Sequence, residues 1–409
     1  MKKLVLALFC VWLGSVLEGA AQSRIDTTGG RYYRPVFANV TRTQDVTYGA
    51  AADFLGNNQN LRLDVYQPTG DTVRRRPLLV FAHGGGFVSG NKNDADVVEL
   101  CTRFARMGYV TASIDYRLLF LPFDTVNIGR AAIRATQDMR AAIRFFRKDA
   151  ATSKTYRIHS GFIYAGGSSA GAFMALQTGY LDKDTEVPAY IGLVALGGLE
   201  GNGGNPGYSS SVQGVVNLCG ALGRPWWIEA GNVPVVSVHG TADAVVPYAA
   251  GTVGGGLPAQ KVYGSAILHA RATAVGVPNR LYTFKRAGHV PYNGSSPAAV
   301  AYMDTTTRVV RDFLRPLLRQ AATVTTTKIA ATAPTPQAFP VPATAAVQLQ
   351  WPATQAFRRQ PVEVLNTTGQ VVRQLQWEQP TLVLRRGALP AGTYLVRTQG
   401  LAVRRIVFL

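Results

Sequence analysis

The chain is poor in cysteine, histidine and acidic residues. Its 409 residues include 3 cysteines, 5 histidines and 23 acidic side chains against 42 lysines and arginines, so the formal net charge is +19. Apart from Cys10 near the N-terminus, the cysteines are Cys101 and Cys219. An oxidising compartment would allow a bridge between these two. They belong to well-separated elements of the chain, however, so we expect two buried free thiols.

Long hydrophobic runs are absent after the N-terminus. Met1–Leu13 combines a basic start with a short apolar stretch, and the small residues Gly19–Ala21 follow. This pattern predicts a signal peptide over residues 1–21, cleaved after Ala21. No later run approaches the roughly 18 apolar residues that a membrane span needs, so we expect no stable span. The expected localisation is the cell surface or the medium, reached through the Sec pathway and the periplasm.

The excess positive charge is not arranged as in proteins that bind nucleic acid. No basic run is interleaved with aromatic side chains that could stack on bases. Arginines and a lysine punctuate an Ala/Ile-rich helical pattern between residues 130 and 148, and their spacing indicates a solvated helix face. We therefore expect no nucleic-acid partner. A partner such as an anionic polysaccharide or an envelope surface would account for the charge, and so would an arginine-rich proteome.

Two short glycine-rich strings are the most informative features that the sequence does contain. His83–Phe87 reads HGGGF, and Gly167–Gly171 reads GSSAG. Each leaves an apolar run typical of a buried parallel strand, at residues 78–82 and 162–165. The first is an HGGG-type oxyanion loop, and the second is a G-x-S-x-G nucleophile elbow. A phosphate-binding loop is excluded for the first, because residues 85–92 lack a Gly-Lys-Ser/Thr ending.

Within the elbow two serines compete for the role of nucleophile. Only Ser169 has glycine at both the −2 and +2 positions, so we assign it as the nucleophile and Ser168 as a bystander. A serine hydroxyl is a weak nucleophile that needs a base, and the base needs an acid to orient it. In proteins with an elbow of this type the chain order is serine, acid, histidine, so both partners are expected beyond Ser169.

Three histidines follow the elbow. His289 lies in a loop after an apolar run, where catalytic groups gather, and is the predicted base. His269 lies in a helical pattern and is interpreted as a surface or packing residue. His239 ends a predicted strand and is expected to stabilise the loop that follows it.

Only six acids lie between Ser169 and His289. Asp243 alone follows a clear strand and is the predicted orienting acid, with Glu200 as the substitute. The others are Asp182, Asp184 and Glu186, which we interpret as solvated, and Glu229.

The order of apolar runs and helical patterns predicts an α/β fold with a doubly wound, mostly parallel sheet over residues 22–320. The expected strands are 61–65, 78–82, 109–114, 162–165, 212–218, 235–238 and 281–284. The Gly/Asn-rich segment 197–211 could border the substrate cleft, and Trp226 and Trp227 could supply an apolar wall there. Paired aromatic residues are, however, more often packing than recognition elements.

The composition changes after residue 320. Residues 321–337 form a Thr/Ala/Pro-rich linker. Short alternating runs at 346–351, 362–365, 371–376, 382–385, 394–397 and 403–408 then predict a small all-β sandwich over residues 338–409. It is close to the lower size at which one core is stable.

The catalytic motifs resemble those of the bacterial carboxylesterase and lipase branch of the α/β-hydrolase superfamily, which includes hormone-sensitive-lipase-like and feruloyl- or acetyl-esterase-like enzymes. The resemblance spans about residues 46–318. It implies that the N–H groups of Gly85, Gly86 and Ala170 form the oxyanion hole and that His83 braces the loop. Common elbows in that branch read GDSAG, so Ser168 departs from the pattern.

The C-terminal module resembles the type A sorting domain of type IX secretion. The resemblance rests on Phe339–Ala343, on Asn366–Val372 and on Leu389–Arg397, which reads LPAGTYLVR. Phe339 and Val341 depart from the usual Tyr-Pro-Asn-Pro string. The resemblance implies the type IX secretion machinery as a partner. A carbohydrate-binding module is the alternative, although the exposed aromatic cluster of a sugar platform is lacking.

Together these features predict a secreted serine carboxylic-ester hydrolase that uses Ser169, Asp243 and His289 and needs no cofactor or metal. Its expected substrate is an ester of a small molecule or of a polysaccharide. A serine peptidase on the same fold is the alternative, and a non-enzymatic surface binding protein is a third hypothesis. Peptidases of this fold usually carry a large added propeller or cap, for which the chain has no room before Val46.

Overall fold

The computed structural model describes residues 25–120, 122–319, 336–352, 357, 359–366, 371–398 and 404–409. The predicted signal peptide and nearly all of the predicted linker lie outside these residues. The chain divides into two compact units, Met1–Thr325 and Thr326–Leu409.

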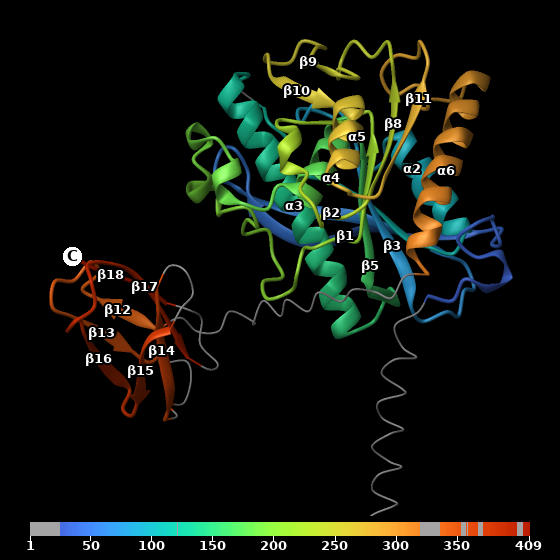
Figure 1. Cartoon of the computed structure of the whole chain (residues 1–409). Coiled ribbons are helices and arrows are strands. Elements are labelled where there is room, and N and C mark those ends of the chain that lie inside the picture. The colour runs from blue at the N-terminus through green and yellow to red at the C-terminus, as the bar shows by residue number, and fades with distance from the viewer. Residues whose placement is uncertain are drawn as a thin grey trace, which may run out of the picture. The chain divides into compact units, whose positions relative to one another are not determined.

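The larger unit is built on an eight-stranded sheet (Figure 1). In spatial order its strands are β1 (Val40–Ala52), β2 (Asn58–Pro68), β4 (Val110–Ile114), β3 (Arg76–Ala82), β5 (Ile158–Ser168), β6 (Val215–Leu218), β8 (Val235–Gly240) and β11 (Asn279–Phe284). The pairs from β4 to β11 are all parallel, whereas β1 and β2 join as antiparallel neighbours. The expected doubly wound, mostly parallel sheet is confirmed.

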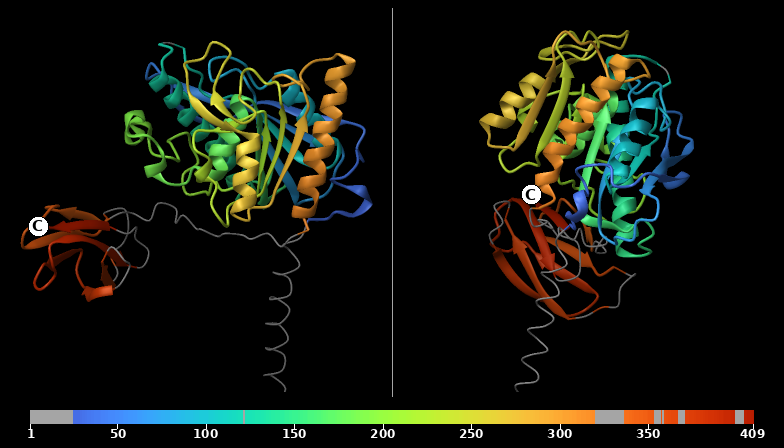
Figure 2. Two further views of the ribbon diagram at one scale, coloured as in Figure 1. Left: turned by 45° about the horizontal axis from the view of Figure 1, so that its top comes forward. Right: turned by 90° about the vertical axis from the view of Figure 1, so that its right-hand side faces the viewer.

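Helices cover both faces of this sheet, as Figures 1 and 2 show. They are α2 (Ala95–Arg106), α3 (Thr125–Ala151), α4 (Ala170–Tyr180), α5 (Ser265–Ala274) and α6 (Pro297–Leu317). Side chains of β3 alternate between two apolar cores. Leu78 and Val80 join α3, α4 and α5 in one core, and Leu79 and Phe81 join α2 and α6 in the other. Because β3 is buried on both faces, its sequence is apolar throughout.

The order of the strands reverses between β3 and β5. After β3 the chain crosses to β4 on one side, and after β5 it crosses to β6 on the other side. The carboxyl ends of two such strands border a crevice that no connection crosses, and ligands of open α/β sheets bind there. The HGGG string follows β3, and the elbow begins in the last two residues of β5, so the fold brings both motifs to this crevice.

Beyond the main sheet, a small antiparallel sheet and several single helical turns complete the larger unit. The small sheet has the order β7 (Ala221–Leu222), β10 (Lys261–Gly264) and β9 (Ala250–Thr252). The turns are η1 (Thr28–Gly30), η2 (Asp184–Glu186), η3 (Ala189–Ile191), η4 (Leu193–Leu196) and η5 (Pro225–Trp227). None of these short elements was expected from the sequence, and neither was β1.

The interpretation of the α3 arginines as a solvated face is wrong for its central members. Arg140 and Arg144 are each only 4% exposed. Arg140 donates to the carbonyl of Leu199 at 2.6 Å, and Arg144 donates to that of Gly204 at 3.0 Å. A guanidinium has five N–H donors, so it can satisfy the carbonyl groups of a loop that has no strand beside it. These arginines therefore hold the Gly-rich segment against α3.

The smaller unit consists of two antiparallel sheets. One contains β12 (Gln337–Phe339), β13 (Ala346–Gln350) and β16 (Thr381–Arg385), and the other contains β15 (Val371–Trp377), β14 (Gln360–Leu365), β17 (Gly392–Thr398) and β18 (Arg404–Phe408). The core includes Val347, Val362, Trp377 and Ile406, each fully buried. The six expected strands are present, and β12, which was not expected, begins in the last residue of the predicted linker.

Cys101 and Cys219 are both buried and both free, as expected. Across the described ranges, we find no helix that is both long and apolar enough to cross a membrane.

Candidate active site

Ser169 stands at the turn between β5 and α4 with φ 53° and ψ −117°. A positive φ is costly for a residue with a side chain, and such strain gathers at functional sites. Glycines make the turn possible, because a Cβ on Gly167 would collide with the backbone of Gly171, and one on Gly171 with the carbonyl of Ala82. The small residues of the elbow are therefore required by the close approach of strand and helix.

The structure brings together the predicted catalytic triad of Ser169, Asp243 and His289, and hydrogen bonds join the three side chains in one relay. His289 Nε2 lies 2.8 Å from the Ser169 hydroxyl oxygen, and its Nδ1 lies 2.7 Å from Oδ2 of Asp243. An ionised carboxylate only accepts hydrogen bonds, so Nδ1 carries the proton that bonds Asp243. Nε2 is then the unprotonated nitrogen and accepts the hydrogen of the serine hydroxyl. This is the tautomer that a general base requires.

Asp243 is fully buried at its side chain, yet it is surrounded by donors. Its Oδ1 accepts the backbone N–H groups of Val245 and Val246, at 2.9 and 2.8 Å. Nε2 of His239 lies 3.2 Å from Oδ2. Burial alone would raise the pKa of Asp243, but the hydrogen bonds from His239 and His289 lower it far below its usual value. The carboxylate is thus kept charged beside His289.

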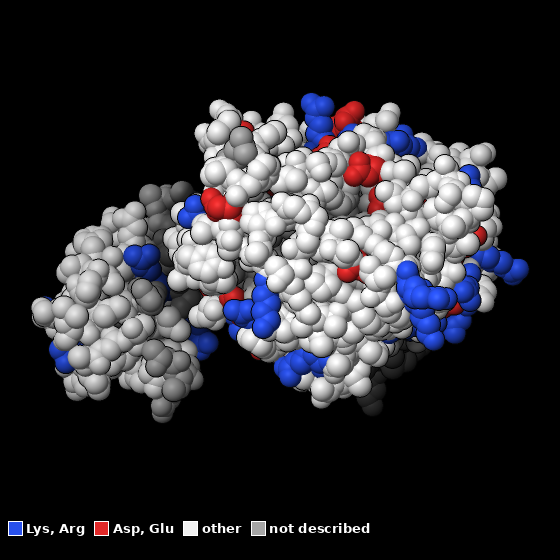
Figure 3. Space-filling view, turned by 90° about the horizontal axis from the view of Figure 1, so that it is seen from above, with Lys and Arg blue, Asp and Glu red and all other residues white. Residues whose placement is uncertain are grey.

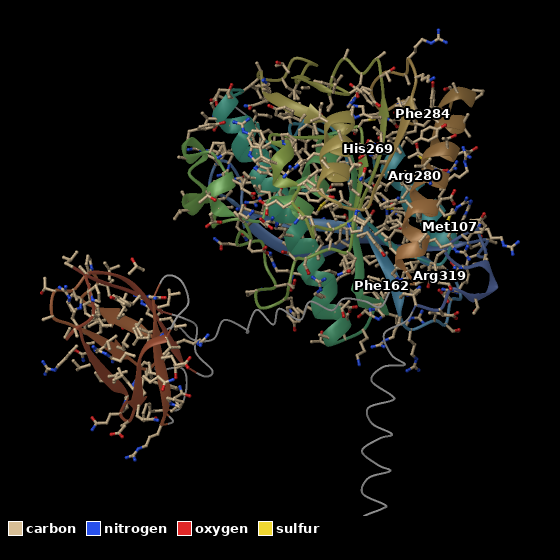
Figure 4. The ribbon with its side chains drawn as sticks, viewed as in Figure 1. Met107, Phe162, His269, Arg280, Phe284 and Arg319 are labelled. Atoms are coloured by element: carbon tan, nitrogen blue, oxygen red, sulfur yellow. The ribbon has the colours of Figure 1, made fainter. Side chains whose placement is uncertain are left out.

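His239 shows why the loop after β8 holds its shape. Its Nδ1 lies 2.8 Å from the hydroxyl of Ser265, and its Nε2 lies 3.0 Å from the carbonyl of Val246. The expected loop-stabilising role is confirmed, and the contact with Asp243 adds a role that the sequence did not reveal. His269, by contrast, lies on α5 (Figure 4), and its Nδ1 contacts the side-chain oxygen of Asn279.

The HGGG loop presents donors to the same crevice. Within the described part of the chain, no hydrogen bond is donated by the backbone N–H of Gly85 or Gly86. Ala170 is the first residue of α4, so its N–H has no acceptor within the helix. Gly85 has φ 94°, and a Cβ there would collide with the carbonyl of Ser89. Three N–H groups therefore remain available where negative charge could develop near Ser169.

The side chain of His83 stabilises the HGGG loop. Its ring stacks on Tyr116 with centroids 4.2 Å apart, and its Nδ1 lies 2.8 Å from the Gly84 carbonyl. The hydroxyl of Tyr116 donates to the same carbonyl at 2.8 Å. Burial lowers the pKa of His83, although the hydrogen bond to Gly84 opposes this. His83 is thus a neutral residue that braces the loop. Its hydrogen bond and its ring contact are with Gly84 and Tyr116 and not with Ser169.

A cavity of about 500 Å³ opens in front of Ser169 and His289. Its walls come from the HGGG loop, the start of α3, the elbow, the η2–η3 segment and the small sheet. Apolar lining residues include Phe87, Ile128, Ile133, Phe173, Val187, Ile191, Trp227, Val253, Leu257 and Val262. This size and this lining suit a small organic ligand. Seen from above in Figure 3, most of the larger unit is covered by uncharged side chains, with Lys and Arg mainly toward its margins.

Several sequence-based expectations about the cavity need correction. Trp227 lines it, but Trp226 is 55% exposed and does not. The 197–211 segment is not among the lining residues; it lies along α3 instead. Glu186 was interpreted as solvated, yet its side chain is 11% exposed and belongs to the cavity wall.

Glu200 cannot serve as the orienting acid. It forms an ion pair with Arg144 at 2.6 Å, in the loop held by α3. His289 has Asp243 at 2.7 Å, so no second acid is needed.

One further group of the described residues could in principle bind a metal ion. Ligand atoms of Cys219, Asp243 and His289 lie within 4.8 Å of one another. Both nitrogens of His289 are already engaged, one with Ser169 and one with Asp243. Burial raises the pKa of Cys219 to about 12, so the thiolate that a metal would require is strongly disfavoured. The group is better explained as a hydrogen-bonded relay.

The sheet order, the strand–turn–helix around Ser169 and the chain order of Ser169, Asp243 and His289 define an α/β-hydrolase fold. Residues 63–223 match the family described as BD-FAE, an esterase family of α/β-hydrolases. The match includes the HGGG loop and the elbow but ends before Asp243 and His289. No curated protein matches the chain.

Solved structures of a bacterial esterase share the fold. Thermogutta terrifontis esterase 2 phosphorylated by paraoxon is 22% identical with a TM-score of 0.51, and covers 69% of this chain and 95% of its own. The apo form of the same esterase is 22% identical with a TM-score of 0.50, and covers 67% of this chain and 94% of its own. At this identity the likeness establishes the fold alone.

Proposed function

We propose that the chain is a serine carboxylic-ester hydrolase that works through an acyl-enzyme. The observation that carries this proposal is the continuous relay from Asp243 through His289 to Ser169, at the wall of a largely apolar cavity. The match of residues 63–223 to an esterase family supports the same reaction class.

In the first half-reaction, Nε2 of His289 takes the proton of the Ser169 hydroxyl while the oxygen attacks the carbonyl carbon of the ester. The carbonyl oxygen becomes an oxyanion, which the N–H groups of Gly85, Gly86 and Ala170 stabilise. His289 then gives the proton to the leaving alkoxide as the C–O bond breaks. The alcohol leaves, and the acyl group stays on Ser169.

In the second half-reaction, water takes the place of the alcohol. His289 accepts a proton from the water, whose oxygen attacks the acyl carbon and forms a second oxyanion. The bond to Ser169 breaks, its oxygen regains the proton from His289, and the carboxylic acid leaves. Throughout, Asp243 remains ionised and fixes the tautomer of His289.

The test is a panel of 4-nitrophenyl acyl esters run beside aminoacyl anilides. We expect release of 4-nitrophenol from the esters and little cleavage of the anilides. In Ser169→Ala, ester turnover should fall by a factor of about 10⁶, by analogy with serine proteases. A wild-type protein that cleaves anilides but not esters would instead be a serine peptidase, and hydrolysis of neither would leave the non-enzymatic reading.

Paraoxon offers a second, stoichiometric test. A structural neighbour is an esterase phosphorylated by this compound. Here we expect the Ser169 oxygen to attack phosphorus and displace 4-nitrophenolate once per chain. Mass spectrometry should find the diethylphosphoryl group on the peptide that contains Ser169, and the Ser169→Ala chain should release no equivalent burst.

We also propose that the enzyme is exported and that residues 338–409 serve as its sorting domain for type IX secretion. This proposal is supported by the sequence of residues 1–21, by the LPAGTYLVR string and by the division of the chain into two compact units. The expected route runs through the Sec pathway and the periplasm to the cell surface or the medium.

A further inference from the structure

The cavity lining includes two exposed cations, Arg224 and Lys261. They come from neighbouring segments of the small sheet. β10 pairs antiparallel with β7, and Tyr263 stands opposite Leu222. Arg224 continues β7 with an extended backbone, φ −145° and ψ 126°. Arg224 and Lys261 are each two residues from the Leu222–Tyr263 pair, toward the same end of the two strands.

Two like charges on the wall of one cavity repel each other unless a counter-charge joins them. Within the described ranges, neither cation forms a salt bridge, and the guanidinium of Arg224 donates to the adjacent Gly223 carbonyl at 3.1 Å. Glu186 is the one acid among the described lining residues, and it is already satisfied. Its carboxylate accepts the N–H groups of Asp182 and Lys183, each at 3.1 Å.

The other acid nearby is engaged as well. Glu229 is paired with Lys183 at 2.5 Å, and the same ammonium lies 3.8 Å from Glu186. Lys183 is the cation paired with these acids, whereas Arg224 and Lys261 form no salt bridge with any described residue. Among the lysine, arginine and acidic side chains that line the cavity, two are positive and only Glu186 is negative.

Each of the two cations lies close to an aromatic ring. The Arg224 guanidinium lies 5.5 Å from the Trp226 ring centroid, and the Lys261 ammonium lies 5.9 Å from that of Tyr263. The two rings are themselves 6.5 Å apart. Cation–π contacts restrain the long side chains without neutralising their charge, so the cations stay available to a ligand.

We propose that Arg224 and Lys261 form a subsite for a carboxylate on the substrate, away from the ester bond that Ser169 attacks. This inference rests on the proposed esterase function. The carboxylate can belong to the acyl half, as in a monoester of a dicarboxylic acid, or to the alcohol half, as in an ester of a hydroxy acid. Both present the same anion to the same two cations, so the experiment has an arm for each.

The acyl arm compares the 4-nitrophenyl monoester of adipic acid with that of adipic acid monoamide, its neutral isostere. The alcohol arm compares 3-acetoxybenzoate with 3-acetoxybenzamide. The readout in each arm is the ratio of kcat/KM for the anionic and neutral members, so a general loss of activity cancels. We expect the wild-type ratio to exceed one in at least one arm and to fall as salt is added, since ions screen exposed charges.

The variants are Arg224→Gln, Lys261→Gln and the double variant. Exposed ion pairs are weak, so we expect the ratio to fall about threefold in each single variant and about tenfold in the double one. Lys261→Arg keeps the charge and should keep the ratio. Lys148→Gln removes an exposed cation at the far end of α3 and is the matched control.

A wild-type ratio of one or less in both arms would overturn the subsite, and so would a ratio that survives in the double variant. If the ratio falls equally in Lys148→Gln, the preference comes from the overall charge of the protein, and the subsite is refuted. If the wild type hydrolyses neither neutral ester, the proposed esterase function fails and this inference falls with it. Hydrolysis of the neutral esters without charge preference refutes the subsite alone.

Discussion

The hydroxyl of Tyr292 lies 2.9 Å from that of Ser168, and both residues are 1% exposed. Ser168 precedes the proposed nucleophile, and Tyr292 lies three residues after His289. The hydrogen bond therefore ties the loop that carries the base to the turn that carries the nucleophile. Burial raises the pKa of Asp96 on α2, and a hydrogen bond with Ser168 opposes this. Ser168, assigned as a bystander, is thus a connecting residue.

Ser168→Ala should keep most of the ester hydrolysis while lowering stability. Removing the hydroxyl leaves a buried Tyr292 hydroxyl with one partner fewer, which costs about 1–3 kcal/mol. Chemical denaturation of Ser168→Ala, Tyr292→Phe and the double variant measures this. We expect the double variant to lose less than the sum of the single losses, because they remove the same bond. Strictly additive losses would show that the bond contributes nothing.

Asp243→Asn should lower turnover by about 10⁴ at neutral pH without unfolding the protein, because the amide favours the wrong tautomer of His289. Glu200→Gln, which alters an ion pair with Arg144 instead, is the control and should keep activity. Steady-state kinetics with a 4-nitrophenyl ester measures both. Since hydrogen bonds hold the pKa of Asp243 far below its usual value, this carboxylate stays ionised as the pH falls and does not account for a loss of wild-type activity on the acid side. A near-normal rate in Asp243→Asn would refute this assignment of the acid.

His83 should make stability depend on pH. Burial lowers its pKa in the folded state below the ordinary value of 6.5, so the unfolded chain binds a proton more readily. Its contribution to the free energy of unfolding is therefore complete above about pH 6.5 and is lost as the pH falls toward the folded-state pKa. His83→Phe keeps a flat ring on Tyr116 but cannot titrate. Its Tm should fall less than that of the wild type between pH 7.5 and 5; equal slopes would contradict the effect.

A chain ending at Ala321 should hydrolyse esters as well as the full mature chain does. The relay and every cavity residue lie between Gly85 and His289, and α6 ends at Leu317. Activity of the two purified proteins is compared with one ester. In the native host the shortened chain should accumulate in the periplasm while the full chain reaches the surface or the medium. An inactive shortened chain would show that the smaller unit completes the catalytic unit.

Sequence reasoning located the central sheet and the relay because both leave local signals. Buried parallel strands are continuous apolar runs, and the elbow needs glycines at fixed positions. β1 leaves no such signal: Val40–Ala52 is polar and only partly buried at the edge of the sheet. Strands of two to four residues, such as β7 and β10, are too short for any periodicity to appear.

The sequence also failed to predict which charged residues are buried. Arg140 and Arg144 have the spacing of an exposed helix face, and only the loop laid across them buries them. Glu186 differs, because its carboxylate accepts the N–H groups of Asp182 and Lys183, which are close in sequence. Contacts with a segment distant in sequence decided the burial of the two arginines, and no single-sequence pattern encodes such contacts.

The proposed nucleophile and oxyanion donors come from the segment before residue 181, whereas a large part of the cavity wall comes from residues 224–262. That stretch begins beside β7 and ends in β10, which are hydrogen-bonded partners, so its two ends lie close together in space. The stretch also contains β8 and Asp243, which the main sheet and the proposed relay require. Substitutions in its remaining cavity-lining parts, around Arg224 to Trp227 and from Val253 to Val262, can change the shape and charge of the cavity without altering the strand–turn–helix around Ser169.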